Sequence, residues 1–169
     1  IVQGVAARRP ELASNLILCD TAHKIGPAQG WADRINTVRE HGLDYIADAV
    51  MERWFAPVFR NNKPADLALW RNMMARTPLE GYVGTCAAIR DADLTDSTAK
   101  LTQPTLCVVG DQDGATPPAL VESMAALITG SRFVVIKDAG HLPSIEQPAQ
   151  LAAAMLKFLQ RHTLQSNRF

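Results

Sequence analysis

The chain has 169 residues, of which 47% are hydrophobic, and its 17 basic and 17 acidic side chains give a formal net charge of zero. This length and composition are typical of one globular domain, and the lack of a basic excess argues against a protein that binds nucleic acid. The apolar runs are short and interrupted by polar residues, which argues against a membrane span or a membrane partner.

The first stretch, residues 1–30, is predicted to contain a helix followed by a strand. Ile1 to Pro10 has the composition of an apolar helix, but no N-cap residue precedes it, which suggests that the beginning of the chain is missing. Leu16 to Cys19 is a continuous apolar run bounded by turn residues, as expected of a strand that is buried on both faces. Both elements are therefore expected to belong to the core of the domain.

The second stretch, residues 31–98, shows helical periodicity and no convincing strand. Apolar residues recur at helical spacing from Leu43 to Trp54, and two more helices are expected over 65–76 and 78–90. All three tryptophans lie in this stretch. A helical insert rich in aromatic residues between strand-bearing segments is typical of a lid over a pocket, with its hinge at Gly30. A plain helical subdomain is the alternative interpretation.

The third stretch, residues 99–169, alternates between strand and helix. Strands are expected over 105–109 and 133–136. One helix is expected to begin just after Thr116, which would be its N-cap, and the last helix is expected to begin near Pro148. Such alternation predicts an α/β fold with a parallel sheet and right-handed crossovers.

Polar loops follow these two strands directly. Gly110 to Asp113 comes after the first strand, and Asp138 to His141 comes after the second. Because parallel strands end at one edge of a sheet and lie about 4.8 Å apart, a carboxylate on one loop can reach an imidazole on the next. An aspartate that holds a histidine in one tautomer is the acid–base half of a catalytic triad. Asp113 is preferred to Asp111 as the acid, whereas a loop-capping aspartate and a structural histidine are the alternatives.

The nucleophile of such a triad is not evident in the chain. No Gly-x-Ser-x-Gly motif occurs, and neither Ser14 nor Cys19 lies on a strand-to-helix turn of the kind that presents a nucleophile. Triads on sheets of this type follow the chain order nucleophile, acid, base. The nucleophile is therefore expected upstream of the acid and the base.

Neither histidine nor cysteine spacing indicates a metal site or a disulfide framework. The remaining histidines fit no metal-ligand pattern and are interpreted as surface residues: His23, His41 and His162. The cysteines are odd in number and far apart, which indicates buried thiols in a reducing cytoplasm: Cys19, Cys86 and Cys107. Neither a metal nor another cofactor is expected.

The loop residues also carry a family resemblance. The pattern Gly110-x-x-Asp113-x-x-x-Pro117, followed by Gly140-His141, is similar to the acid and base motifs of α/β-hydrolases. Within that superfamily the chain resembles 3-oxoadipate enol-lactonases. The segments that carry this resemblance are Trp31-x-x-Arg34-Ile35, Ala47-Asp48-Ala49-Val50-x-Glu52-Arg53-Trp54-Phe55, Glu80-Gly81-Tyr82, Ala87-Ala88-Ile89-Arg90-Asp91-Ala92-Asp93 and Glu146-Gln147-Pro148.

The resemblance implies the C-terminal part of an α/β-hydrolase. Residues 1–30 and 99–169 would form the hydrolase core, and the helical lid of residues 31–98 would be inserted between them. The first helix would be the one that follows the nucleophile elbow, so a serine a few residues before Ile1 would be the nucleophile. The chain alone is then expected to be inactive.

The resemblance also implies a substrate, 3-oxoadipate enol-lactone, which is a small carboxylated lactone of aromatic catabolism. Its carboxylate needs a cation, and Arg34 is the first candidate, with Arg53 and Arg90 as the others. Trp31 and Trp54 are expected to form apolar walls of the substrate site. The expected partners are thus a lactone or ester substrate and the missing N-terminal portion of the same protein.

The same fold supports other functions, which stay open at this point. An esterase would share the triad, whereas a dehalogenase or an epoxide hydrolase would carry an aspartate at the elbow. A non-catalytic receptor could bind a small molecule under the lid, but such a protein is expected to have lost a member of the triad.

Overall fold

The computed structural model describes residues 1–166, and the side chains of residues 1–161. Its sheet contains the parallel strands β1 (Leu16–Cys19), β2 (Thr105–Gly110) and β3 (Arg132–Ile136), in the order β1-β2-β3. The register aligns Leu16 with Thr105 and Leu106 with Arg132. All three predicted strands are confirmed to within one residue at their ends, as is the α/β class with a parallel sheet.

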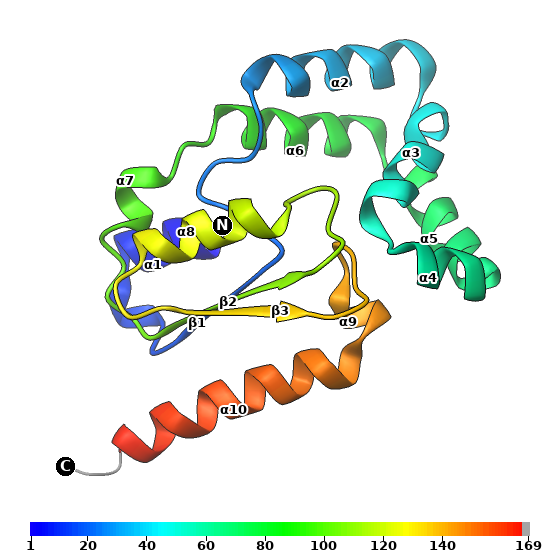
Figure 1. Cartoon of the computed structure of the whole chain (residues 1–169). Helices are drawn as coiled ribbons and strands as arrows, with labels where there is room; N and C mark the ends of the chain where they lie inside the picture. The colour runs from blue at the N-terminus through cyan, green and yellow to red at the C-terminus, as the bar shows by residue number, and fades with distance from the viewer. Residues whose placement is uncertain (167–169) are drawn as a thin grey trace.

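Helices cover both faces of the sheet, which explains why β2 is buried along its whole length (Figure 1). Successive residues of a strand point to opposite faces. Cys107 and Val109 accordingly pack in the apolar cluster formed with α1 (Val2–Arg8) and α8 (Pro118–Leu127). Leu106 and Val108 face α10 (Pro148–Ser166) and pack with its Leu151 and Phe158. The central strand is therefore buried on both faces, whereas β1, which the sequence predicted to be buried on both faces, alternates buried and half-buried residues.

Five helices make up most of the segment that was expected to be a lid, and they share an apolar cluster of their own. They are α2 (Ala28–His41), α3 (Asp44–Trp54), α4 (Pro57–Asn62), α5 (Pro64–Ala75) and α6 (Leu79–Asp91). Helices α2 and α6 run side by side, with α3, α4 and α5 beyond one end of the pair (Figure 1). The predicted helices within 43–54, 65–76 and 78–90 are confirmed. The cluster draws on all five helices and includes Val38, Met51, Phe59, Met74 and Val83.

Two residues singled out in the sequence lie at or near the start of a helix. Gly30, the expected hinge, lies in the first turn of α2, where its N–H donates to the carbonyl oxygen of Pro27 at 3.1 Å. Thr116 is not the N-cap of α8, because the chain enters that helix one residue later at Pro117 and no side chain caps it. The hydroxyl of Thr116 is engaged elsewhere, in the site described below.

Three short elements complete the described chain: η1 (Pro10–Leu12), α7 (Thr95–Thr98) and α9 (Pro143–Glu146). Helix α7 packs against α1 and α8. Its Thr98 hydroxyl donates to Gln3 Oε1 at 2.6 Å, and Gln3 Nε2 donates to the Ala22 carbonyl oxygen at 3.1 Å. These buried bonds tie the chain that leaves the lid to the sheet side of the molecule.

None of the helices within residues 1–166 is both long enough and apolar enough to cross a membrane. The three cysteines are free thiols, with Cys86 and Cys107 buried and Cys19 half-buried. Of the remaining histidines, His41 is exposed and His23 is half-buried, while the side chain of His162 lies outside the described ones.

Candidate active site

The loop after β2 holds the carboxylate of Asp113 in place by hydrogen bonds. Asp113 is only 3% exposed. Its Oδ1 accepts from the backbone N–H groups of Ala115 at 2.7 Å and Thr116 at 2.9 Å, and its Oδ2 accepts from the Thr116 hydroxyl at 2.7 Å. These three donors fix the orientation of the carboxyl group, and one direction that remains open at Oδ2 leads toward the loop after β3.

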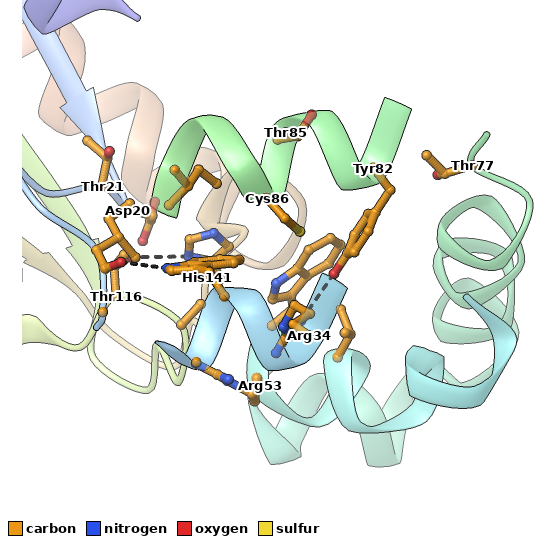
Figure 2. A pocket seen from close by; sticks show the side chains of 18 of the residues that line it. Asp20, Thr21, Arg34, Arg53, Thr77, Tyr82, Thr85, Cys86, Thr116 and His141 are labelled. Carbon is orange, nitrogen blue, oxygen red and sulfur yellow. Dashed lines mark hydrogen bonds between the residues drawn. The ribbon is translucent and has the colours of Figure 1, made fainter. Parts of the chain in front are cut away.

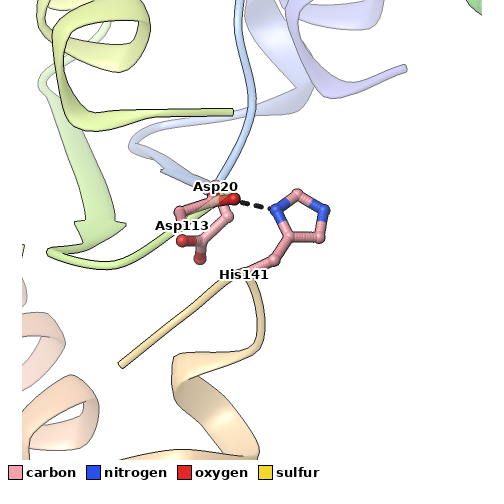
Figure 3. Close-up of side chains that lie close together, drawn as sticks. All are labelled: Asp20, Asp113 and His141. Atoms are coloured by element: carbon pink, nitrogen blue, oxygen red, sulfur yellow. Dashed lines mark hydrogen bonds and ion pairs between the residues drawn. The ribbon is translucent and has the colours of Figure 1, made fainter. Parts of the chain in front are cut away.

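That remaining direction leads to His141, whose Nδ1 lies 2.8 Å from Asp113 Oδ2 (Figure 3). A carboxylate only accepts, so Nδ1 carries the proton and Nε2 keeps its lone pair. Burial by itself raises the pKa of Asp113, but the hydrogen bond and charge of His141, together with the bonds from Thr116, outweigh burial and lower it. The structure thus brings together the two residues that the sequence singled out, as a hydrogen-bonded pair in which the pKa of the carboxyl group is lowered.

Two glycines allow close approaches around the site. A Cβ on Gly110 would collide with the carbonyl oxygens of Ala139 and Gly140, so a side chain there would push the loops after β2 and β3 apart. The 2.8 Å contact between Asp113 and His141 depends on that separation. A Cβ on Gly140 would collide with the carbonyl oxygen of Trp54, so a side chain there would push the loop after β3 away from the end of α3.

The end of α3 is bonded to both loops. The N–H of His141 donates to the Trp54 carbonyl oxygen at 2.7 Å, and the N–H of Gly114 donates to the Arg53 carbonyl oxygen at 3.1 Å. The side chain of Arg53 reaches the same loop, where Nε donates to the Gly114 carbonyl oxygen at 3.2 Å. The lid and the two polar loops therefore form one hydrogen-bonded unit at this point.

Glu146 adds a second connection between the base loop and the lid. Its Oε1 accepts from the N–H of Gly140 at 2.7 Å, and its Oε2 accepts from the N–H of Ala56 at 2.8 Å. Burial raises the pKa of Glu146 and outweighs the lowering effect of these bonds. One carboxyl group thus joins the residue before His141 to the chain that leaves α3.

A pocket of about 730 Å³ opens between the loops and the lid (Figure 2). His141 and Thr116 line its sheet side, and the predicted substrate-binding residues Trp31, Arg34 and Trp54 line its lid side. The ring of Trp54 lies with its centroid 6.1 Å from that of His141. The structure thus places all three lid residues around one cavity that the base also reaches.

Arg34 is held at the pocket wall without a carboxylate partner. Its Nη1 donates to the hydroxyl of Tyr82 at 3.1 Å, and its guanidinium carbon lies 5.7 Å from the ring centroid of Trp31. Trp31 is itself fixed, because its Nε1 donates to the Ile25 carbonyl oxygen at 2.6 Å. In the part of the chain that the structure describes, no acidic group forms an ion pair with Arg34.

The two other candidate arginines differ in their positions. Arg53 lines the pocket and is also free of an ion pair among the described residues. Arg90 pairs with Asp91 at 2.8 Å and is not among the residues that line the pocket. Of the three candidate arginines, Arg34 and Arg53 therefore line the pocket.

A family model described as the alpha/beta hydrolase family matches residues 3–154. The chain belongs to this family. The parallel sheet, the two polar loops and the helices between β1 and β2 agree with the resemblance that the sequence motifs carried. The hydrogen-bonded Asp113 and His141 lie inside the matched range.

Enol-lactonases and esterases are among the proteins to which this hydrolase is similar. The 3-oxoadipate enol-lactonase 2 of Acinetobacter baylyi is 33% identical over 159 residues, covering 94% of this chain and 59% of the relative. The crystal structure of the enol-lactonase from Burkholderia xenovorans matches with a TM-score of 0.89 at 34% identity, covering 94% of this chain and 60% of that one. A thermophilic esterase from Thermogutta terrifontis, with malate bound, matches with a TM-score of 0.86 at 32% identity and covers 95% and 61%. The hydrolase chain spans about three-fifths of the length of these relatives.

Several pocket residues of this hydrolase were not expected from the sequence. Thr116 supports Asp113, and its hydroxyl also lies 3.4 Å from His141 Nδ1. Tyr82 binds Arg34. Cys86 lies on the same helix as Tyr82, α6, and also lines the pocket. Asp20 lines the pocket at the end of β1. Asp20 could have been found by the rule that identified Asp113 and His141, since it too is a polar residue directly after a buried strand.

The rival carboxylates near the site do not contact the base. Asp111 Oδ1 accepts from the N–H of Ala139 at 3.2 Å, and Asp138 is exposed. Asp20, Asp113 and His141 have ligand-type atoms within 4.8 Å of one another, so within residues 1–161 they form a possible metal cluster. Four donors already occupy Asp113, however, and one of them is the ring that would have to bind the ion. This arrangement favours a hydrogen-bonded acid–base pair over a metal site.

Proposed function

We propose that the protein carrying this chain hydrolyses a small carboxylated enol-lactone, 3-oxoadipate enol-lactone, with Asp113 as the acid and His141 as the base of a triad. The observation that carries the proposal is the 2.8 Å Asp113–His141 pair, which opens on a pocket lined by Trp31 and the unpaired Arg34. The third member of the triad is proposed to be a serine located N-terminal to Ile1. The similarity to enol-lactonases at about one-third identity supports the choice of substrate.

The proposed reaction uses the free lone pair of His141 Nε2. The serine hydroxyl attacks the ring carbonyl carbon, its proton passes to Nε2, and Asp113 stabilises the imidazolium that forms. Collapse of the tetrahedral intermediate breaks the ring C–O bond and releases an enolate, which takes the proton from Nε2 and ends as a ketone, leaving the imidazole neutral again. Water then attacks the acyl-serine, giving one proton to Nε2, which returns it to the serine oxygen as the acid leaves.

The charge of the pocket supports an anionic substrate. Arg34 and Arg53 are cationic lining residues, and Asp20 is the acidic side chain among those that line the described cavity. Arginine suits carboxylates because its planar fork matches their two oxygens. Trp31 supplies an apolar face against which the carbon skeleton of a small lactone can pack.

An esterase is the second candidate, because the similarity to the Thermogutta terrifontis esterase is almost as great as that to the enol-lactonases. Such an enzyme would use the same pair without requiring a carboxylate on the substrate. A dehalogenase or epoxide hydrolase would require an aspartate in place of the proposed serine. We keep a cytoplasmic location as part of the proposal, since the three cysteines are free thiols.

The test is a comparison of two substrates on the full-length protein that carries this chain. Turnover of 3-oxoadipate enol-lactone should exceed that of an uncharged ester such as p-nitrophenyl acetate, as judged by kcat/KM. His141→Ala should abolish both activities. Equal or higher kcat/KM on the uncharged ester would overturn the lactonase proposal in favour of the esterase.

A further inference from the structure

Asp20 occupies an unusual position directly after β1. Its N–H still donates to the Val108 carbonyl oxygen at 2.8 Å, so the residue remains attached to the neighbouring strand. Its φ of 47° lies in the left-handed region, which aspartate and asparagine tolerate better than most residues. The side chain is buried, and its Oδ1 accepts from the N–H of Gly110 at 3.0 Å.

This placement brings a second carboxyl group to the acid–base pair. Oxygen atoms of Asp20 and Asp113 and a ring nitrogen of His141 lie within 4.8 Å of one another (Figure 3). The three residues follow three adjacent strands, β1, β2 and β3, at the same edge of the sheet. The cluster therefore results from the strand order and not from a local turn.

Only one of the two carboxyl groups has the partners that an anion needs. Asp113 accepts four hydrogen bonds, from two backbone N–H groups, a hydroxyl and the imidazole. Asp20 accepts a hydrogen bond from the N–H of Gly110 and is 8% exposed. Two carboxylates that share a buried site cannot both ionise easily, so the proton stays on the group with fewer donors.

We propose that Asp20 is a positioning residue that acts as a neutral carboxylic acid, donating a hydrogen bond to Asp113 so that a single negative charge faces His141. The inference rests on the proposed role of His141 as the base. A second anion beside the imidazole would favour its protonated form and remove the lone pair on Nε2 that the proposed reaction needs. A neutral Asp20 avoids that effect and still satisfies the N–H of Gly110.

The electrostatics of the cluster agree with this assignment. Burial raises the pKa of Asp20 to about 7; the bond from Gly110 opposes that rise, whereas the charge of Asp113 and its hydrogen bond to Asp20 add to it. The titratable groups that interact with Asp20 are Asp113, His141 and Cys19, one from the end of each strand. Burial raises the pKa of Cys19 to about 11, so the thiol carries no charge near neutral pH.

The consequence for folding has a definite sign. The pKa of Asp20 rises from 3.8 to about 7, so the folded state binds a proton more tightly than the unfolded state does. The contribution of Asp20 to the stability of the wild type therefore falls as the pH rises from about 4 to about 7 and levels off above that. Asp20→Asn removes this ionisation but keeps the shape, the acceptor for Gly110 and a donor for Asp113.

The experiment is chemical unfolding of the full-length protein and its Asp20→Asn variant at several pH values between 4 and 8. The variant should gain stability relative to wild type as the pH rises. Asp111→Asn is the matched control, since it makes the same chemical change on a neighbouring loop outside the cluster, and it should show no such trend. A stability difference between Asp20→Asn and wild type that stays constant over this range would overturn the proposal.

Two further measurements separate this inference from the choice of substrate. The ¹³C resonance of the Asp20 side-chain carboxyl in the unmutated protein should titrate about three pH units above the ordinary value, and titration near 4 would refute the inference even if the variant fails to fold. The acidic limb of kcat/KM, on whichever ester is turned over, should keep its position in Asp20→Asn, because the amide is as neutral as the carboxylic acid that it replaces. A limb that moves down by about one pH unit, as expected when one neighbouring charge is removed, would show that Asp20 is an anion beside the base and would overturn the proposal. Failure of the lactonase proposal leaves the unfolding and resonance measurements intact.

Discussion

Replacing Arg34 tests which end of the substrate the lid recognises. Arg34 is half-buried, is bonded to Tyr82 at 3.1 Å and stacks near Trp31, so little side-chain entropy remains to be lost when a carboxylate binds. No acidic group among the described residues has to be displaced first. A hydrogen bond to a charged group contributes about 1.5–3 kcal/mol, which corresponds to about 10- to 150-fold in binding.

Arg34→Ala is therefore expected to lower kcat/KM for 3-oxoadipate enol-lactone by about 10- to 150-fold and to leave an uncharged ester nearly unaffected. Arg34→Met retains most of the aliphatic stem and should show the same loss, which separates charge from packing. Arg39→Ala is the matched control, since Arg39 lies on the same helix but is exposed and pairs with Glu80 at 3.2 Å.

The assay measures both substrates on wild type and the three variants. Equal losses on the lactone and the uncharged ester would show that Arg34 only supports the lid. No loss on either substrate would show that the carboxylate is bound elsewhere, and Arg53 would be the next pocket cation to replace.

Three more predictions follow from the hydrogen bonds at the sheet edge. Asp113→Asn should lower kcat by a factor of about 10⁴, the loss found in a serine protease when its acid is changed in this way. Asp111→Asn should have little effect, and comparable losses from the two changes would mean that the acid is misassigned. Glu146→Ala leaves two backbone N–H groups without their acceptor and should lower the free energy of unfolding, measured in urea, by about 2–6 kcal/mol. Glu122→Ala, on the exposed side of α8, is the control and should lower it by less than about 0.5 kcal/mol. The isolated chain should turn over neither substrate above its own His141→Ala control, and measurable turnover would point to a nucleophile within it.

The parts of the fold and site that could be predicted are those governed by strand ends. The three strands are short continuous apolar runs, and the polar residues after two of them, Asp113 and His141, had to meet because parallel strands share one edge. Asp20 obeys the same rule but was passed over. The apolar run before it, Leu16 to Cys19, was interpreted only as a core strand. The strand order that places β1 next to β2 cannot be read from one sequence.

The lid was predicted less well because its local signals conflict with its packing. Proline and glycine normally interrupt helices, but Pro27 precedes the first turn of α2 and Gly30 lies inside it. The packing of Val38, further along α2, in the apolar cluster of the lid outweighs the low helix propensity of glycine. The partners of Arg34 could not be predicted either. Tyr82 lies 48 residues away on α6, and only the pairing of α2 with α6 brings the two together.

Apart from one bond from the Arg53 side chain, the bonds between the end of α3 and the segments beside His141 involve main-chain atoms on the lid side: the carbonyl oxygens of Arg53 and Trp54 and the N–H of Ala56. Every residue type supplies a carbonyl oxygen, and every type except proline supplies an N–H. Mutational drift at these positions can therefore remodel the cavity wall without displacing the imidazole. An exchange of lids between related enzymes would therefore do best to keep residues 53–56 and to replace the pocket-lining helices α2 and α6 on either side of them.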